Sequence, residues 1–187
     1  EVFVSRLELE QSGVILGYPA PKSGEKTERV ANVLSSILGS GMDSRLFTEV
    51  REKRNLVYGI YSQYMADKTV GMFLISFHTR HSNLEAAKEL VFEELEKIVS
   101  NPHSEEEFER NKNKLKTSFY RHFQSSEDEI FLIINKYFFD GKSPSLKNVT
   151  KKLDAVTIDE VVNLAKVIFS SPRVLAVSKK IEAEENE

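Results

Sequence analysis

The chain has 187 residues, of which 40% are hydrophobic and 29% are charged. This balance is typical of one soluble globular domain with a hydrophobic core and not of a disordered protein. The net charge is −3, with 26 basic and 29 acidic residues interspersed, so no overall field draws the chain to nucleic acid or to a membrane. The sequence contains no cysteine, which excludes disulfides, thiolate catalysis and Cys-ligated zinc and fits a reducing compartment.

The ends of the chain indicate a piece of a longer protein. Position 1 is Glu and not Met, and no secretory leader follows it. No apolar run approaches the roughly 20 residues that span a bilayer. We expect a cytoplasmic protein, with an organelle matrix as the alternative location.

The beginning of the chain predicts a strand followed by a helix. Residues 5–18 alternate and then become apolar, which indicates one strand, or a pair of short strands, that Pro19 breaks. From Lys26 onwards apolar residues recur at helical spacing. This amphipathic helix is expected to end at Gly39 and Gly41, which serve as cap and turn residues.

The next segment predicts a short helix and a β-hairpin. Asp43 or Ser44 is expected to cap the helix, which stops near Asn55. Residues 56–65 and 69–79 are rich in aromatic and β-branched side chains, and a short polar turn separates them. These features favour two antiparallel strands.

The second half of the chain is mainly helical. Four segments open with a Ser/Thr-x-x-Glu capping box, in which the two side chains bond backbone N–H groups at the start of a helix. The boxes are formed by Ser82 with Glu85, Ser104 with Glu107, Ser126 with Glu129, and Thr157 with Glu160. Ser143 and Pro144 predict a further short helix, with proline in its first position. Residues 173–178 predict a last strand, and the acidic residues 182–187 predict a frayed tail.

This order of elements predicts an α+β fold, in which helices pack on one face of a mainly antiparallel sheet. No internal repeat or linker divides the sequence. Residues 1–187 are therefore expected to form a single domain.

The motif of greatest chemical interest lies at residues 38–58, LGSGMDSRLFTEVREKRNLVY. A glycine-rich turn, a Ser-Arg-Leu-Phe helix, a basic helix end and a tyrosine that opens a strand follow one another. This stretch resembles the signature region of the C-terminal domain in pitrilysin/insulinase-type zinc metallopeptidases, which include the mitochondrial processing peptidases and insulin-degrading enzymes. The resemblance extends more loosely over nearly the whole chain.

The resemblance implies a division of labour between two halves of the same fold. In the family, an N-terminal half or subunit binds the catalytic zinc through His-x-x-Glu-His, and the C-terminal half faces it across a closed chamber. The C-terminal half contributes an arginine and a tyrosine, seven residues apart, which hydrogen-bond the substrate near the scissile carbonyl. These positions correspond to Arg51 and Tyr58. A guanidinium and a phenol are suitable donors to a developing oxyanion.

Without the resemblance, ordinary structural roles would explain the same residues. Arg51 would be a solvated or ion-paired helix residue, and Tyr58 a half-buried aromatic residue of the hairpin. We expect Arg45 to be structural and to join two helices through an ion pair.

The sequence predicts no metal site and no cofactor site in this chain. His-x-x-Glu-His does not occur, so the fragment alone is expected to be inactive. His78 and His81 form the one close pair, and no glutamate lies between them to act as a base, so a structural or surface role is expected. His103 is expected in a loop and His122 on a charged helix.

A short basic run is the sequence feature that comes nearest to a nucleic-acid site. Lys112, Lys114 and Lys116 follow an acidic first helical turn. This order suits the helix dipole, so a solvated helix face explains the lysines better than a nucleic-acid site.

Three functions remain open at this point. The leading one is the substrate-binding and transition-state-assisting half of a zinc endopeptidase that cleaves peptides or unfolded segments. Its partners would be the metal-binding half, a peptide and possible further copies of the chain. The alternatives are a non-catalytic scaffold or regulatory homologue of the same family, and a module that binds peptides or helices without proteolysis.

Overall fold

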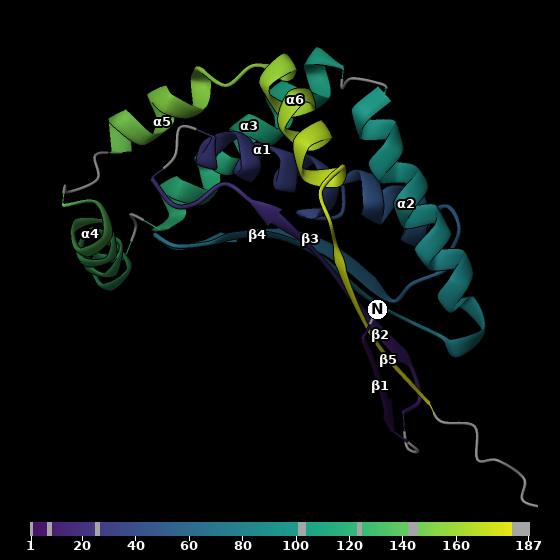
Figure 1. Ribbon diagram of the computed structural model, residues 1–187. Coiled ribbons are helices and arrows are strands. Elements are labelled where there is room, and N and C mark those ends of the chain that lie inside the picture. Colours follow the sequence, from purple (N-terminus) through teal and green to yellow (C-terminus); the bar gives the residue numbers. More distant parts are fainter. Residues whose placement is uncertain are drawn as a thin grey trace, which may run out of the picture.

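The computed structural model describes residues 2–6, 9–24, 27–100, 104–122, 125–141 and 146–180. They form a five-stranded sheet with helices gathered on one side of it (Figure 1). The strands are β1 (Val2–Arg6), β2 (Ser12–Ala20), β3 (Gly59–Ala66), β4 (Gly71–Thr79) and β5 (Val174–Lys180). Their order in the sheet is β1-β5-β2-β4-β3. β1 runs parallel to β5, and the other neighbouring strands are antiparallel.

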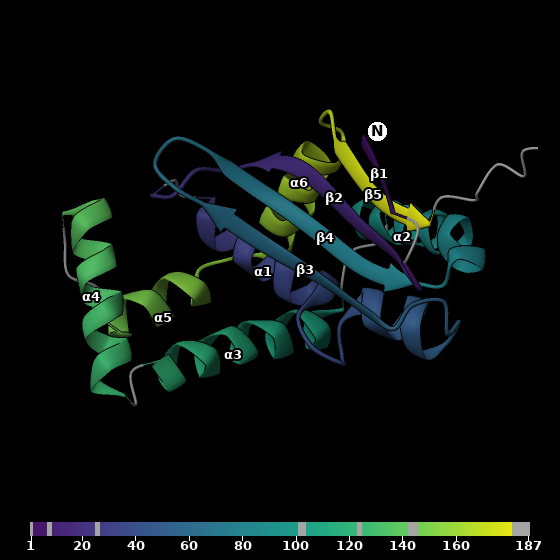
Figure 2. The same ribbon diagram turned by 90° about the horizontal axis from the view of Figure 1, so that it is seen from below.

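The helices gather on the upper side of the sheet as Figure 1 is drawn, apart from the one at the far left, which stands beside the end of the sheet. They are α1 (Glu28–Gly39), the π-helix η1 (Phe47–Glu52), the 3₁₀ turn η2 (His81–Asn83), α2 (Leu84–Ser100), α3 (Glu105–His122), α4 (Ser126–Asp140), α5 (Leu146–Asp154) and α6 (Ile158–Phe169). Figure 2, from below, shows the opposite face of the sheet in front of the helices. The predicted fold, α+β with helices on one face of a mainly antiparallel sheet, is confirmed.

The one-sided arrangement follows from the alternation of side chains along a strand. In β2, Val14 and Leu16 are buried against the helices, whereas Ile15 between them is 52% exposed. β4 repeats the pattern, with Phe73 buried and Met72 exposed. The strands therefore present one face to the core and leave the other open.

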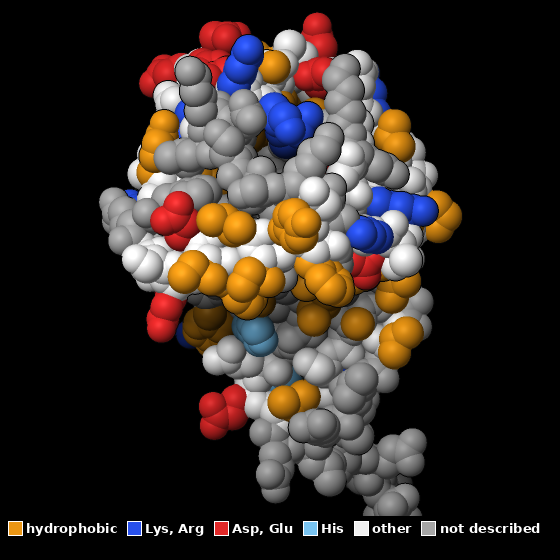
Figure 3. Space-filling view, turned by 90° about the vertical axis from the view of Figure 1, so that its left-hand side faces the viewer, with side chains coloured by type: hydrophobic (Ala, Val, Ile, Leu, Met, Phe, Trp, Pro, Cys, Tyr) orange, Lys and Arg blue, Asp and Glu red, His pale blue; other side chains and the backbone are white. Residues whose placement is uncertain are grey.

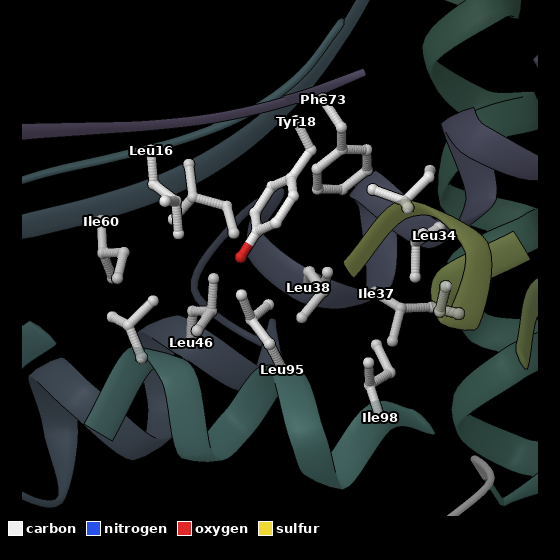
Figure 4. Close-up of a cluster of buried hydrophobic side chains, with 14 of the residues drawn as sticks. Leu16, Tyr18, Leu34, Ile37, Leu38, Leu46, Ile60, Phe73, Leu95 and Ile98 are labelled. Atoms are coloured by element: carbon white, nitrogen blue, oxygen red, sulfur yellow. The ribbon is translucent and has the colours of Figure 1, made fainter. Parts of the chain in front are cut away.

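The core lies between the sheet, α1 and α2 (Figure 4). The labelled side chains come from the sheet, from α1, from α2 and from the segment before η1: Leu16, Tyr18, Ile60 and Phe73; Leu34, Ile37 and Leu38; Leu95 and Ile98; and Leu46. Burial of one such side chain stabilises a fold by roughly 1.5–3 kcal/mol. Among the described helices, none is both long and apolar enough to cross a membrane.

Pro19 does not end β2, because the strand continues to Ala20. β5 pairs with β2 only as far as Gly17. Proline lacks the N–H group that a ladder needs and is tolerated where one side of a strand has no partner. The missing donor of Pro19 therefore costs no bond on the β5 side.

Gly39 has a different role from the predicted helix cap. It is the last residue of α1, and Ser40 is the cap. A Cβ atom on Gly39 would lie 2.3 Å from the backbone nitrogen of Ser62 in β3. Gly39 thus permits the close approach of α1 to β3. Gly41 has a φ of +99°, which confirms it as a turn residue.

Two of the predicted capping boxes are supported by hydrogen bonds. Thr157 and Glu160 form the full box at the start of α6, with both side chain-to-backbone bonds present. At the start of α3, the hydroxyl of Ser104 accepts a hydrogen bond from the backbone N–H of Glu107 at 3.1 Å.

The other two boxes were wrong in detail. In α4 the cap lies one residue earlier, because Ser125 and not Ser126 accepts from the backbone N–H of Asp128. Ser82 lies within η2, and its hydroxyl contacts the side chain of Asn83 at 3.4 Å. Ser82 is therefore part of the 3₁₀ turn ahead of α2, and its hydroxyl does not cap that helix.

Two further predicted elements are present in the structure, and the other predicted features fall on residues that it does not describe. The last strand is confirmed as β5, and the predicted helix after the proline is described as α5 from Leu146 onwards. Ser143, Pro144 and the tail 182–187 lie outside the described residues.

Gly39→Ala is expected to destabilise the fold by about 1–3 kcal/mol, the usual cost of overpacking a tight contact. Gly59→Ala is the matched control, since a Cβ atom there meets nothing within 4 Å. Denaturant unfolding of both variants measures the difference. Equal stabilities would show that α1 and β3 are not in close contact at Gly39.

Thr157→Ala is expected to lower the free energy of unfolding by about 1 kcal/mol, because it removes a complete capping box. Ser82→Ala removes a residue with the same sequence pattern but without a cap bond, and it should change stability by less than about 0.5 kcal/mol. Thermal unfolding of the two variants provides the comparison. Losses of equal size would contradict the assignment of the two helix starts.

Candidate functional site

The short helix in the sequence motif is present, but it is a π-helix, Phe47–Glu52. Single π turns widen a helix and occur frequently at functional sites. The predicted cap was wrong: the hydroxyl of Ser44 donates to the carbonyl oxygen of Gly41 at 2.7 Å. The carboxylate of Asp43 instead binds Lys114 Nζ at 2.6 Å, and this hydrogen bond lowers the pKa of Asp43 below its ordinary value.

Arg45 has the structural role that was expected. Its Nε and Nη2 atoms donate to the two carboxylate oxygens of Glu107 at 2.9 and 2.8 Å. Both side chains are largely shielded, with 20% and 17% exposed. This two-bond pair holds the segment before η1 against α3.

The turn between η1 and β3 is held at both of its ends. On the η1 side, the N–H groups of Asn55 and Leu56 donate to the carbonyl oxygens of Arg51 and Val50. Asn55 has a left-handed φ of 50°, a conformation that asparagine tolerates better than most residues. The chain thereby reverses within a few residues.

On the strand side, the end of β4 fixes the turn. The N–H of Tyr58 donates to the carbonyl oxygen of His78 at 2.9 Å. The hydroxyl of Thr79 donates to the carbonyl oxygen of Leu56. Two consecutive residues of β4 thus position the backbone that carries Tyr58.

The side chain of Tyr58 is 48% exposed and does not enter the core. Its oxygen accepts a hydrogen bond from Nε of Arg80 at 3.2 Å, and this bond raises the pKa of the Arg80 guanidinium. Because the phenol oxygen accepts from Arg80, its own O–H remains available as a donor. Arg80 was not among the residues that the sequence singled out.

Arg51 is also exposed. Its guanidinium lies over the ring of Phe47, 4.7 Å from the ring centre, which is a cation–π contact within η1. Arg51 and Tyr58 are therefore held by different neighbours, the one by Phe47 and the other by Arg80. Their predicted roles toward a substrate stay predictions.

Within the described residues, no group of three His, Asp or Glu side chains is arranged to hold a metal ion. His81 is bonded on both ring nitrogens, to the hydroxyl of Ser12 at 2.7 Å and to the carbonyl oxygen of Leu9 at 2.8 Å. These bonds give His81 a structural role, as expected. His78 is exposed. The donor set that the structure describes does not fit zinc.

The basic run on α3 is not a solvated face, and that prediction was wrong. Lys112 is 4% exposed, and its Nζ contacts the Glu109 carboxylate at 2.8 Å and the carbonyl oxygen of Asp154 at 3.2 Å. Lys116 also pairs with Asp154. Lys112 and Lys116 join α3 to the end of α5.

The open face of the sheet carries an apolar hollow of about 450 Å³. Its lining comes from β2, β4, β5 and the turns beside them, and includes Ile15, Met72, Leu74, Val174 and Ala176. Ile15, Met72 and Val174 are 52%, 41% and 62% exposed. This face offers apolar contact area to a partner or a peptide.

The sequence model of the peptidase M16 inactive domain matches residues 1–115, which is more than half of the chain. The chain belongs to this family. Among curated proteins, the M16 inactive domain is 28% identical over 177 residues to "uncharacterized zinc protease YmxG" of Bacillus subtilis. The match covers 95% of this chain but 43% of YmxG. The chain thus spans less than half the length of this curated relative.

Solved structures share the fold. A protease from Helicobacter pylori and a peptidase M16 inactive domain from Pseudomonas fluorescens each have a TM-score of 0.86 and 22% identity. The two matches cover 95% and 98% of this chain, and 43% and 44% of the respective solved chains. A chain of Complex III2 from Candida albicans has a TM-score of 0.84 at 17% identity, with 95% of this chain and 45% of that chain covered.

Arg45→Met is expected to destabilise the M16 inactive domain by about 1–3 kcal/mol, because it removes both hydrogen bonds that the shielded Glu107 carboxylate accepts from Arg45. Lys53→Met is the control, since the pair that Lys53 forms with Glu49 is largely exposed and should contribute less than about 1 kcal/mol. Urea unfolding measures both. A similar loss in the two variants would contradict the structural role of Arg45.

Proposed function

We propose that this M16 inactive domain is the substrate-binding, transition-state-assisting half of a zinc endopeptidase that cleaves peptides or unfolded segments. The observation that carries the proposal is the exposed pair Arg51 and Tyr58, which stands in the segment that resembles the family signature. The relative YmxG is named a zinc protease, and the matched domain is the family's inactive one. The metal would therefore belong to another half or subunit.

The proposed chemistry of this chain is hydrogen bonding to a peptide carbonyl. Zinc bound in the other half would supply the activated water. Tyr58 would donate its O–H, and Arg51 an N–H, to the carbonyl oxygen as negative charge develops on it. Both groups are exposed, and both are attached to backbone that hydrogen bonds already fix. Such prior positioning avoids a reorganisation cost during the reaction.

The open face of the sheet supports the substrate part of the proposal. An extended peptide needs a surface with apolar contact area beside polar donors. The hollow around Leu74 and the exposed Tyr61 provide that area on the face opposite the helices. We expect the fragment alone to be inactive, because His-x-x-Glu-His is absent from its sequence.

The second candidate function is a non-catalytic scaffold or regulatory homologue. The observation that favours it is the likeness in fold to a chain of Complex III2. A scaffold has no use for exposed hydrogen-bond donors at Arg51 and Tyr58, so a test of these two side chains separates the candidates. The cytoplasmic location also stays a prediction, which imaging of the tagged full-length protein would check.

Tyr58→Phe in the full-length protein is expected to lower kcat on the order of 10²–10³-fold, the usual loss for one oxyanion donor. Arg51→Met should also lower kcat. The assay is cleavage of a quenched fluorescent peptide, with zinc content and unfolding measured alongside. Both variants remove exposed groups, so zinc content and stability should stay unchanged.

Tyr120→Phe and Arg54→Met are the matched controls, since both side chains are exposed and neither belongs to the proposed site. Their turnover should stay within about twofold of the parent protein, as for surface substitutions away from a site. Unchanged turnover in Tyr58→Phe and Arg51→Met would overturn the proposed role. A full-length protein that binds zinc but cleaves no peptide would favour the scaffold.

A further inference from the structure

Helix α4 is apolar on more than one side. Residues 130–134 and 137–139 read IFLII and YFF. A helix with this composition has to be covered on more than one face, because an ordinary surface helix shows a single apolar stripe. In the structure one side of α4 is nevertheless open to solvent.

The open side forms a continuous stripe. Its members are Ile130, Phe131, Ile134, Tyr137 and Phe138, which are 56%, 71%, 59%, 64% and 78% exposed. Their spacing of three and four residues puts them on one helix face. We call this set the α4 stripe. Figure 3 shows hydrophobic side chains in a band across the middle of this end of the molecule, with further ones below.

The place of α4 in the fold separates the stripe from the core. Figures 1 and 2 show α4 standing beside the end of the sheet, next to α5 and clear of the helical layer formed by α1, α2 and α6. Single exposed apolar residues are common on protein surfaces, whereas a contiguous set of large ones marks an interaction surface. The α4 stripe is such a set.

We infer that the α4 stripe is the docking surface for the metal-binding half of the protein. YmxG and the Pseudomonas fluorescens domain match nearly this whole chain, yet 57% and 56% of their own length lies outside the match (100 minus 43 and 100 minus 44). This remainder has room for a domain larger than the present one. The stripe contains no charged side chain, so the surface that receives it on the metal-binding half is apolar.

Docking at α4 is compatible with the candidate site. Figure 2 shows α4 beyond the end of the sheet where β4 begins, whereas Tyr58 is bonded to His78 near the end of β4. A partner seated on α4 therefore leaves the turn that carries Tyr58 uncovered.

This inference rests on the proposed function, because it takes the metal-binding half as the occupant. Its test is independent of catalysis. The chain has no cysteine, so a single introduced one is unique within this half. Ile134→Cys and Tyr137→Cys place a thiol in the stripe, and Val167→Cys places one on α6, where the side chain is 67% exposed.

The measurement is the rate of modification by a maleimide in the full-length protein, or in the complex with the metal-binding subunit. We expect Ile134→Cys and Tyr137→Cys to react at least about tenfold more slowly than Val167→Cys, since burial excludes the reagent. Where both halves are parts of one chain, the rates should not change on dilution. After unfolding in urea, all three thiols should react at the same rate.

Two results would overturn the inference. Equal rates at the stripe and at Val167→Cys in the native protein would mean that nothing covers α4. Where both halves are parts of one chain, protection that disappears on dilution would mean that a second copy, and not the metal-binding half, occupies the stripe. Loss of peptide cleavage in the Tyr58 and Arg51 variants is measured separately, so the proposed function and this inference fail in distinguishable ways.

Discussion

The pairing of β3 with β4 is the interaction on which the candidate site depends. The turn before β3 has little regular structure of its own and contains Asn55 in a left-handed conformation. The end of β4 gives this turn its shape through the bonds from Tyr58 and Thr79. The direction of the phenol is thus a property of the strand pair, whereas the direction of Arg51 is a property of η1. Both have to form correctly for the two donors to share a site.

The sequence predicted the elements well and the register less well. A turn at residues 66–68 would pair Met65 with Thr69, whereas the structure pairs Met65 with Met72. The turn is longer because Asp67 accepts hydrogen bonds from the N–H groups of Thr69 and Val70. This shift moves the partner of Tyr58 toward the end of β4 and brings Arg80 to its hydroxyl. Arg80 was missed because its contact depends on that register.

Other differences have the same origin, in contacts between residues distant in sequence. Lys112 fits a charged helix face in the sequence, yet the end of α5 covers it and its ammonium group bonds the carbonyl oxygen of Asp154. Gly39 matches the sequence pattern of a helix cap, yet glycine is needed there because the backbone of β3 leaves no room for a Cβ atom. Periodicity and capping patterns report on local structure, and they carry no information about which neighbour packs against a position. The α4 stripe was overlooked for a related reason, since its capping pattern marked only where the helix starts.

The parallel pairing of β1 with β5 has a consequence for the order of assembly. Val2 pairs with Ala176, so the first strand of the chain has no place in the sheet until the last one has been made. The antiparallel strands β2, β3 and β4 can pair before β5 has been synthesised, because residues 12–79 contain all three. During synthesis, the central sheet can form on α1 while β1 remains unpaired, and a later step pairs β1 with β5. Contacts of such long separation slow folding, which makes the β1 edge the last part of the sheet to be secured.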